Sequence, residues 1–193
     1  ARYADYDFYT LIESDVFFSQ TAAQAFVDAL DSRPEHAIAG RLKPHKDAPK
    51  YSKRLKNIGL DNRWGCIFPV SRVHRDVVRR MLKLRKHASV EMPKARLNDE
   101  AILAGAAQAD GLEAAPLEMV LPKMFGGQTY DTNPPHLFEP LLKREAETRV
   151  FHPVVQFETV LERIASGQKN YGRHRLRKIL KMASPDMRTA ISQ

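Results

Sequence analysis

The chain has 193 residues, of which 43% are hydrophobic and 28% charged, and its 31 Lys and Arg against 23 Asp and Glu give a net charge of +8. These proportions are typical of a globular protein with a substantial core, and no stretch approaches the roughly 18 consecutive apolar residues of a membrane-spanning helix. The polar first residues do not resemble a signal peptide. The excess of positive charge suits a polyanionic partner, such as nucleic acid, an anionic membrane or a nucleotide diphosphate.

The first predicted element is a strand over residues 6–12, which are aromatic and β-branched and therefore typical of a strand buried on both faces. An acidic turn, Glu13-Ser14-Asp15, follows it and leads directly into Val16-Phe17-Phe18. Ser19 and its neighbours are candidate caps for a helix over 22–30. Two carboxylates are thus fixed between apolar runs, at the end of a strand where α/β sheets bind ligands.

Two neighbouring carboxylates repel each other unless a cation neutralises them. Oxygen ligands suit Mg²⁺ or Mn²⁺, and either ion can bridge to a diphosphate and absorb the charge that develops when it leaves. A turn without metal is the alternative, because acidic residues are common in turns.

The middle of the chain alternates predicted strands and helices, which favours an α/β fold. We expect strands over 37–42, 64–70 and 112–117, and a polar, lysine-rich loop over 43–63. Ser71 is a candidate cap for a helix whose apolar stripe is Val73, Val77, Val78, Met81, Leu82 and Leu84, and Asn98 or Asp99 caps an alanine-rich helix to about 109. Cys66 lies in an apolar run, so it is interpreted as a buried residue, and a lone cysteine favours a reducing, cytoplasmic compartment.

The last third of the sequence contains a predicted long flexible loop over 122–136, with paired glycines and prolines, and an extended segment over 149–155. An amphipathic helix over 157–165 is predicted to end at Gly167, and a basic helix covers 174–183.

The segment Tyr6 to Phe18 resembles the strand and acidic motif of GT-A-type, nucleotide-sugar-dependent glycosyltransferases, with Glu-x-Asp in place of Asp-x-Asp. The resemblance extends over roughly residues 6–155. It implies a GT-A-like α/β fold with a mixed sheet flanked by helices, and Mn²⁺ or Mg²⁺ held first by Asp15 and second by Glu13. It also implies a nucleotide-sugar donor and a carbohydrate or lipid-linked acceptor, as in polysaccharide biosynthesis.

Two later features follow the order of that family. Asn98-Asp99-Glu100 opens the alanine-rich helix, where the family places an acidic pair, one member of which is the catalytic base or an acceptor ligand. The family's usual order is Glu then Asp, whereas this chain has Asp then Glu; Glu100 is preferred as the base and Asp99 is the alternative. The positive end of a helix keeps such a carboxylate ionised. His152, in Val150-Phe151-His152-Pro153, matches the family's late histidine ligand, although a structural histidine is an equal interpretation.

The resemblance further suggests that Trp64 stacks on a sugar and that Arg72, or alternatively Arg75, meets a phosphate, in donor or acceptor binding. A core tryptophan and arginines on the solvated face of a helix are the plainer interpretations. We expect residues 1–155 to form the catalytic portion and 156–193 a basic helical extension. The nucleotide-binding strands that precede the acidic motif in the family are expected upstream of this chain.

Two other functions compete with this hypothesis. The basic helix after Ser71 and the basic residues 173–178 suit a nucleic-acid-binding α/β module without catalysis, but no known module pattern is present. The basic C-terminal helix also suits attachment to an anionic membrane surface. This second role is compatible with a transferase, whose location would then be cytoplasmic and peripheral to the membrane.

Overall fold

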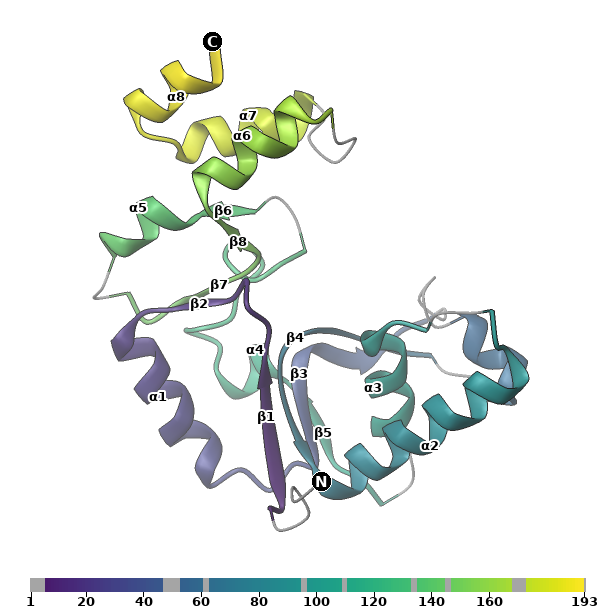
Figure 1. Cartoon of the computed structure of the whole chain (residues 1–193). Coiled ribbons are helices and arrows are strands. Elements are labelled where there is room, and N and C mark those ends of the chain that lie inside the picture. The colour runs from purple at the N-terminus through teal and green to yellow at the C-terminus, as the bar shows by residue number, and fades with distance from the viewer. Residues whose placement is uncertain are drawn as a thin grey trace. The chain divides into compact units, whose positions relative to one another are not determined.

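The computed structural model describes residues 6–46, 53–60, 63–94, 97–108, 111–132, 135–144, 147–167 and 173–192. It is a mixed α/β fold of two compact units (Figure 1). The first unit contains residues 1–13 and 32–122, and the second contains residues 14–31 and 123–193. The helices after residue 155 therefore belong to the same unit as residues 14–31 and 123–155, a different division from that expected between 1–155 and 156–193.

The first unit is built on a four-stranded mixed sheet with the strand order β1-β4-β3-β5. Strands β1 (Phe8–Ile12) and β3 (Ala37–Pro44) pair antiparallel with the long central strand β4 (Trp64–His74). The short strand β5 (Ala114–Pro116) runs parallel to β3. Strands β3 and β4 include the strands predicted over 37–42 and 64–70, and both are almost wholly buried along their apolar runs.

Helices α2 (Arg75–Glu91) and α3 (Asp99–Ala107) pack beside β4 (Figure 1). Asn98 caps α3 by accepting a hydrogen bond from the Ala101 amide. Small residues allow α3 to be buried on nearly every side, and Leu103 joins Phe68 and Val77 in the core. The unit also contains the 3₁₀-helix η1 (Lys53–Ile58), in part of the predicted 43–63 loop, and the short helix α4 (Leu117–Val120).

Two local predictions for the first unit are wrong. Strand β1 is not buried on both faces, because it is the outermost strand of its sheet, and Leu11 and Ile12 are 44% and 48% exposed. Ser71 does not cap a helix, because β4 continues to His74. There Ser71 pairs with Leu11 on one side and Ala39 on the other, and two neighbouring strands outweigh a local capping preference. His74 caps α2 instead, its ring accepting from the Asp76 amide.

The second unit combines short strands with helices. Strands β2 (Phe17–Phe18) and β7 (Val150–Phe151) pair antiparallel, whereas β6 (His136–Leu137) and β8 (Val154–Val155) pair parallel. The helices of this unit are α1 (Gln20–Asp31), α5 (Phe138–Leu142), α6 (Phe157–Ala165), α7 (Arg173–Met182) and α8 (Pro185–Ser192). Ser19 caps α1, and Gly167, with a φ of 66°, follows the end of α6, as predicted.

An aromatic core extends from α1 into the segment predicted to be a long flexible loop. The rings of Phe26 and Phe125 are 6.0 Å apart, and those of Phe125 and Tyr130 are 4.9 Å apart. Phe125 and Tyr130 are almost fully buried. The segment predicted as a loop therefore contributes buried side chains to the core at residues 124, 125, 129 and 130, while the residues around its glycines are more exposed.

A second core cluster forms where the C-terminal helices meet the strands of this unit. Leu137, Val160, Ile179 and Ala183 are buried together there. Within the described residues, none of the helices is both long enough and apolar enough to cross a bilayer.

The buried thiol of Cys66 gives a test of the first unit. Burial raises the pKa of this thiol far above its usual range, and its Sγ donates a hydrogen bond to the Glu100 carbonyl at 3.4 Å. We expect the thiol of the native protein not to react with a colorimetric thiol reagent at pH 8. In denaturant, each chain should react once and release one equivalent of the coloured product. Rapid labelling of the native protein, followed by a colorimetric thiol assay, would contradict the buried position.

Candidate metal centre and adjoining pocket

Asp15 and His152, far apart in the sequence, lie together in the second unit. The backbone carbonyl of Asp15 accepts a hydrogen bond from the Val154 amide at 2.7 Å, and Phe17 pairs with Phe151 in the adjoining strands. This pairing places the Asp15 carboxylate Oδ1 3.7 Å from the His152 Nε2. Two of the three predicted metal ligands are thus neighbours because the strands adjoining them, β2 and β7, pair.

His152 is held in one orientation by the segment 129–131. Its backbone amide donates to the Thr129 carbonyl at 2.8 Å, and its backbone carbonyl accepts from the Asp131 amide at 3.1 Å. Its ring Nδ1 lies 2.6 Å from the Asp131 carbonyl oxygen. Because a carbonyl only accepts hydrogen bonds, Nδ1 carries the proton and donates it. The Nε2 atom that faces Asp15 then holds either a second proton or a free lone pair.

The imidazole and the carboxylate differ in exposure. The His152 side chain is 7% exposed and packs beside the buried Tyr130, with ring centroids 5.6 Å apart. The Asp15 side chain is 44% exposed. The buried and oriented Nε2 of His152 therefore lies beside the Asp15 carboxylate, which solvent and ligands can reach.

Glu13 is the third candidate ligand. It is exposed and ends the first segment of the other unit, with only Ser14 between it and Asp15 along the chain. Its amide donates to the Pro69 carbonyl at 2.8 Å, which ties this end of β1 to β4.

The donor atoms of the pair fit a divalent cation. Metal–ligand bonds of about 2.0–2.2 Å allow two ligands of one ion to be up to about 4.4 Å apart, and the Asp15 and His152 atoms fall within that limit. A neutral imidazole whose other nitrogen donates to a carbonyl is the usual arrangement of a metal-ligating histidine. A carboxylate together with an imidazole is a ligand pair that Mn²⁺ accepts.

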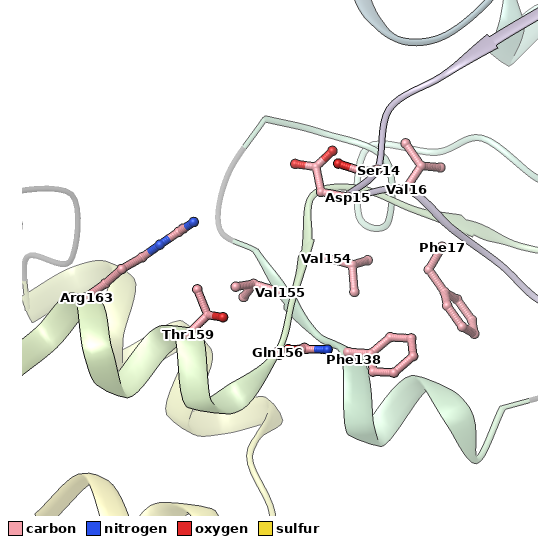
Figure 2. A pocket seen from close by; sticks show the side chains of 10 residues that line it. All are labelled: Ser14, Asp15, Val16, Phe17, Phe138, Val154, Val155, Gln156, Thr159 and Arg163. Atoms are coloured by element: carbon pink, nitrogen blue, oxygen red, sulfur yellow. The ribbon is translucent and has the colours of Figure 1, made fainter.

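A pocket of about 350 Å³ opens beside Asp15, entirely within the second unit (Figure 2). Phe17, Phe138, Val154 and Val155 give it an apolar wall. Its polar side chains are Ser14 and Asp15 near one end and Gln156, Thr159 and Arg163 on the side of α6. The mixture of an aromatic ring, hydroxyls, an amide and both signs of charge is the kind that binds a polar organic molecule with some apolar surface.

The remaining predicted site residues lie in the first unit. Glu100 and Asp99 are in the first turn of α3, as predicted, and Asp99 forms an ion pair with Arg85. Trp64 begins β4 and packs, partly buried, against the core, which is the plainer of its two interpretations. The structure therefore places Asp15 and His152 in one unit and the candidate base in the other.

Arg72 is not on the solvated face of a helix. It is a buried residue of β4, and its guanidinium carbon lies 3.6 Å from the centroid of the Phe8 ring. It also donates to the Glu35 carbonyl at 3.4 Å. These contacts hold β1 and the start of β3 to β4, so Arg72 has a structural role here; its predicted contact with a phosphate remains a prediction.

Sequence reasoning did not identify the polar residues of α6 that line the pocket. Thr159 and Arg163 are one turn apart, which is the only signal in the sequence that they share a face. Nothing in the sequence indicated that Asp131 would orient His152, because that contact uses the backbone carbonyl.

No protein-family model matches this chain, and neither a curated protein nor a solved structure matches it at a significant level. The site must therefore be interpreted from its own geometry and chemistry.

The stability of the second unit should fall in mild acid because of His136. Burial lowers the pKa of this imidazole, Arg144 acts in the same direction, and the Thr129 backbone opposes them. The unfolded chain then binds more protons than the folded chain near and below pH 6.5, so the free energy of unfolding decreases as the pH falls through that value. The His136→Phe variant keeps an aromatic ring beside Phe151 and should lose less stability between pH 7.5 and 5.5. Denaturant titrations measure the difference, and equal losses in both proteins would contradict it.

Proposed function

We propose that this protein is a metal-dependent glycosyltransferase that moves a sugar from a nucleotide diphosphate to a glycan or a lipid-linked acceptor. The observation that carries the proposal is the Asp15–His152 pair, because the acidic motif and the late histidine of the family implied these residues as ligands of one ion. Their Oδ1 and Nε2 atoms are 3.7 Å apart. The mixed α/β architecture is compatible with the proposal but does not by itself indicate a function.

In this proposal Asp15 and His152 hold Mn²⁺ or Mg²⁺, and the resemblance implies Glu13 as a further ligand. The ion, when bound, neutralises the charge that develops on the departing diphosphate. Asp131 keeps the His152 lone pair directed at Asp15 through the hydrogen bond to Nδ1.

The pocket beside Asp15 would accommodate a substrate sugar. Phe138 offers a ring face for the C–H surface of a pyranose, and Gln156 and Thr159 offer hydrogen bonds to its hydroxyl groups. Glu100, with Asp99 as the alternative, would take the proton of the acceptor hydroxyl. Asp99 already pairs with Arg85, which favours Glu100 for this role.

Polysaccharide biosynthesis on a lipid-linked acceptor would place the protein in the cytoplasm, at the periphery of a membrane. This location is part of the proposal.

Removal of the proposed ligands should weaken cation binding. We expect Asp15→Asn and His152→Asn each to reduce Mn²⁺ affinity at least roughly tenfold, because even a change in the groups that orient a ligand has an effect of that size. Asparagine at position 152 can still donate to the Asp131 carbonyl but lacks Nε2. Electron paramagnetic resonance of free Mn²⁺ during a titration measures the affinity of each protein.

Asp28→Asn is the matched control. Asp28 is an exposed carboxylate on α1 of the same unit, bonded only to Gln24 among the described residues, and its replacement should leave Mn²⁺ binding unchanged. A wild-type protein that does not bind Mn²⁺, or an affinity that all four proteins share, would refute the metal centre. If binding is confirmed, Mn²⁺-dependent release of nucleoside diphosphate from a panel of nucleotide sugars tests the transfer chemistry, and Asp15→Asn should abolish it.

A further inference from the structure

The outer face of helix α2 combines exposed aliphatic and basic side chains. Val77 and Ala88 are buried on the inner side of this helix, against the core of the first unit. At about 100° of rotation per residue, the opposite side carries a set of five residues that we call the α2 outer face. These residues are Arg79, Leu82, Lys83, Lys86 and Val90, and all of them are exposed.

The aliphatic residues of this face are unusually accessible. Leu82 is 61% exposed and Val90 is 69% exposed. They are two turns apart on the helix, with Lys83 and Lys86 between them along the chain. An exposed leucine alone is ordinary, but here two aliphatic residues share one helical face with basic residues, so this face offers both apolar surface and positive charge.

The charges of α2 are only partly neutralised within the unit. Arg75 pairs with Asp7 at 3.3 Å, and Arg79 pairs with Asp76 at 3.0 Å. Across the described residues, Lys83 and Lys86 have no acidic partner. The centre of the α2 outer face is therefore positively charged, and the side chains that carry this charge are long and flexible.

The basic C-terminal helix α7 lacks this combination. Its apolar side is used inside the second unit, where Ile179 is fully buried. Lys178 and Lys181 are exposed, but no large aliphatic residue is exposed beside them in the described part of α7. A surface with exposed charge and no exposed aliphatic side chain can attract an anionic membrane but has nothing to insert into it.

We propose that the α2 outer face binds an anionic lipid surface. Leu82 and Val90 would enter the boundary between headgroups and acyl chains, while Lys83 and Lys86 extend to the phosphates. Nucleic acid offers the same phosphate charge, but a phosphate backbone gives the two aliphatic side chains no apolar environment. The combination therefore favours lipid. The proposal does not depend on glycosyl transfer or on the metal centre.

Vesicle sedimentation tests the proposal with the full chain. We expect binding to phosphatidylcholine vesicles that contain 30% phosphatidylglycerol, weak binding to pure phosphatidylcholine, and loss of binding at high salt. Lys83→Glu/Lys86→Glu should lower the partition coefficient roughly 30-fold or more, from the contribution expected of two basic residues near an anionic surface. Leu82→Ser/Val90→Ser should lower it roughly tenfold without changing the net charge.

Two matched controls identify the surface. Lys178→Glu/Lys181→Glu makes the same change of charge on α7, and Met119→Ser removes an aliphatic side chain that is 76% exposed elsewhere in the first unit. Both should bind vesicles far more tightly than the α2 variants.

The proposal is overturned if wild type does not bind anionic vesicles, if the α7 variant loses as much binding as the α2 variant, or if the Leu82/Val90 variant binds like wild type. Tight, salt-sensitive binding to random duplex DNA without vesicle binding would also overturn it, in favour of a nucleic-acid surface. Circular dichroism of each variant verifies that it is folded.

Discussion

The pairing of two short strands, β2 and β7, is the constraint on which the candidate site depends. Phe17 faces Phe151 in this pair, and the Asp15 carbonyl accepts a hydrogen bond from the Val154 amide just beyond it. These contacts join two segments that are far apart in the sequence. The carboxylate of Asp15 and the imidazole of His152 become neighbours only because of them, and the same two segments supply Phe17, Val154 and Val155 to the wall of the pocket.

This pairing creates a position between Asp15 and His152 for which a proton and a metal cation compete. The Asp131 carbonyl fixes the proton of His152 on Nδ1, so Nε2 faces Asp15 either as an N–H donor or as a free lone pair. With a proton there, the two residues form an ion pair of modest strength, because Asp15 is partly exposed. With a cation there, both residues are ligands and the charge of the carboxylate is used to bind it. The same geometry thus supports a structural ion pair or a metal centre, and cation binding distinguishes them.

The predicted site residues are divided between the two units. The metal pair and the pocket lie in the second unit, whereas Glu100, Trp64 and the basic helix α2 lie in the first. The chain passes between the units at residues 13/14, 31/32 and 122/123, and Glu13 and Asp15 lie on either side of the first of these crossings. Lipid binding by α2 would concern the first unit alone, so metal binding and membrane attachment can be measured and altered independently.

The sequence by itself determined the strongly patterned elements and the identity of the candidate ligands. Ser19, Asn98 and Gly167 marked helix ends correctly, because a cap acts within a few residues of its own position. Asp15 and His152 were candidates because of their residue types, their local context and the resemblance of the chain to GT-A-type glycosyltransferases. Tertiary structure decided the features that depend on distant partners. Strand β4 continues past Ser71 because strands lie on both sides of it. Phe125 and Tyr130 are buried because they pack against each other in an aromatic core. Tertiary structure also decided the 3.7 Å approach of Asp15 to His152 and the orientation of the imidazole, since a strand register and a backbone carbonyl leave no local signature in the sequence.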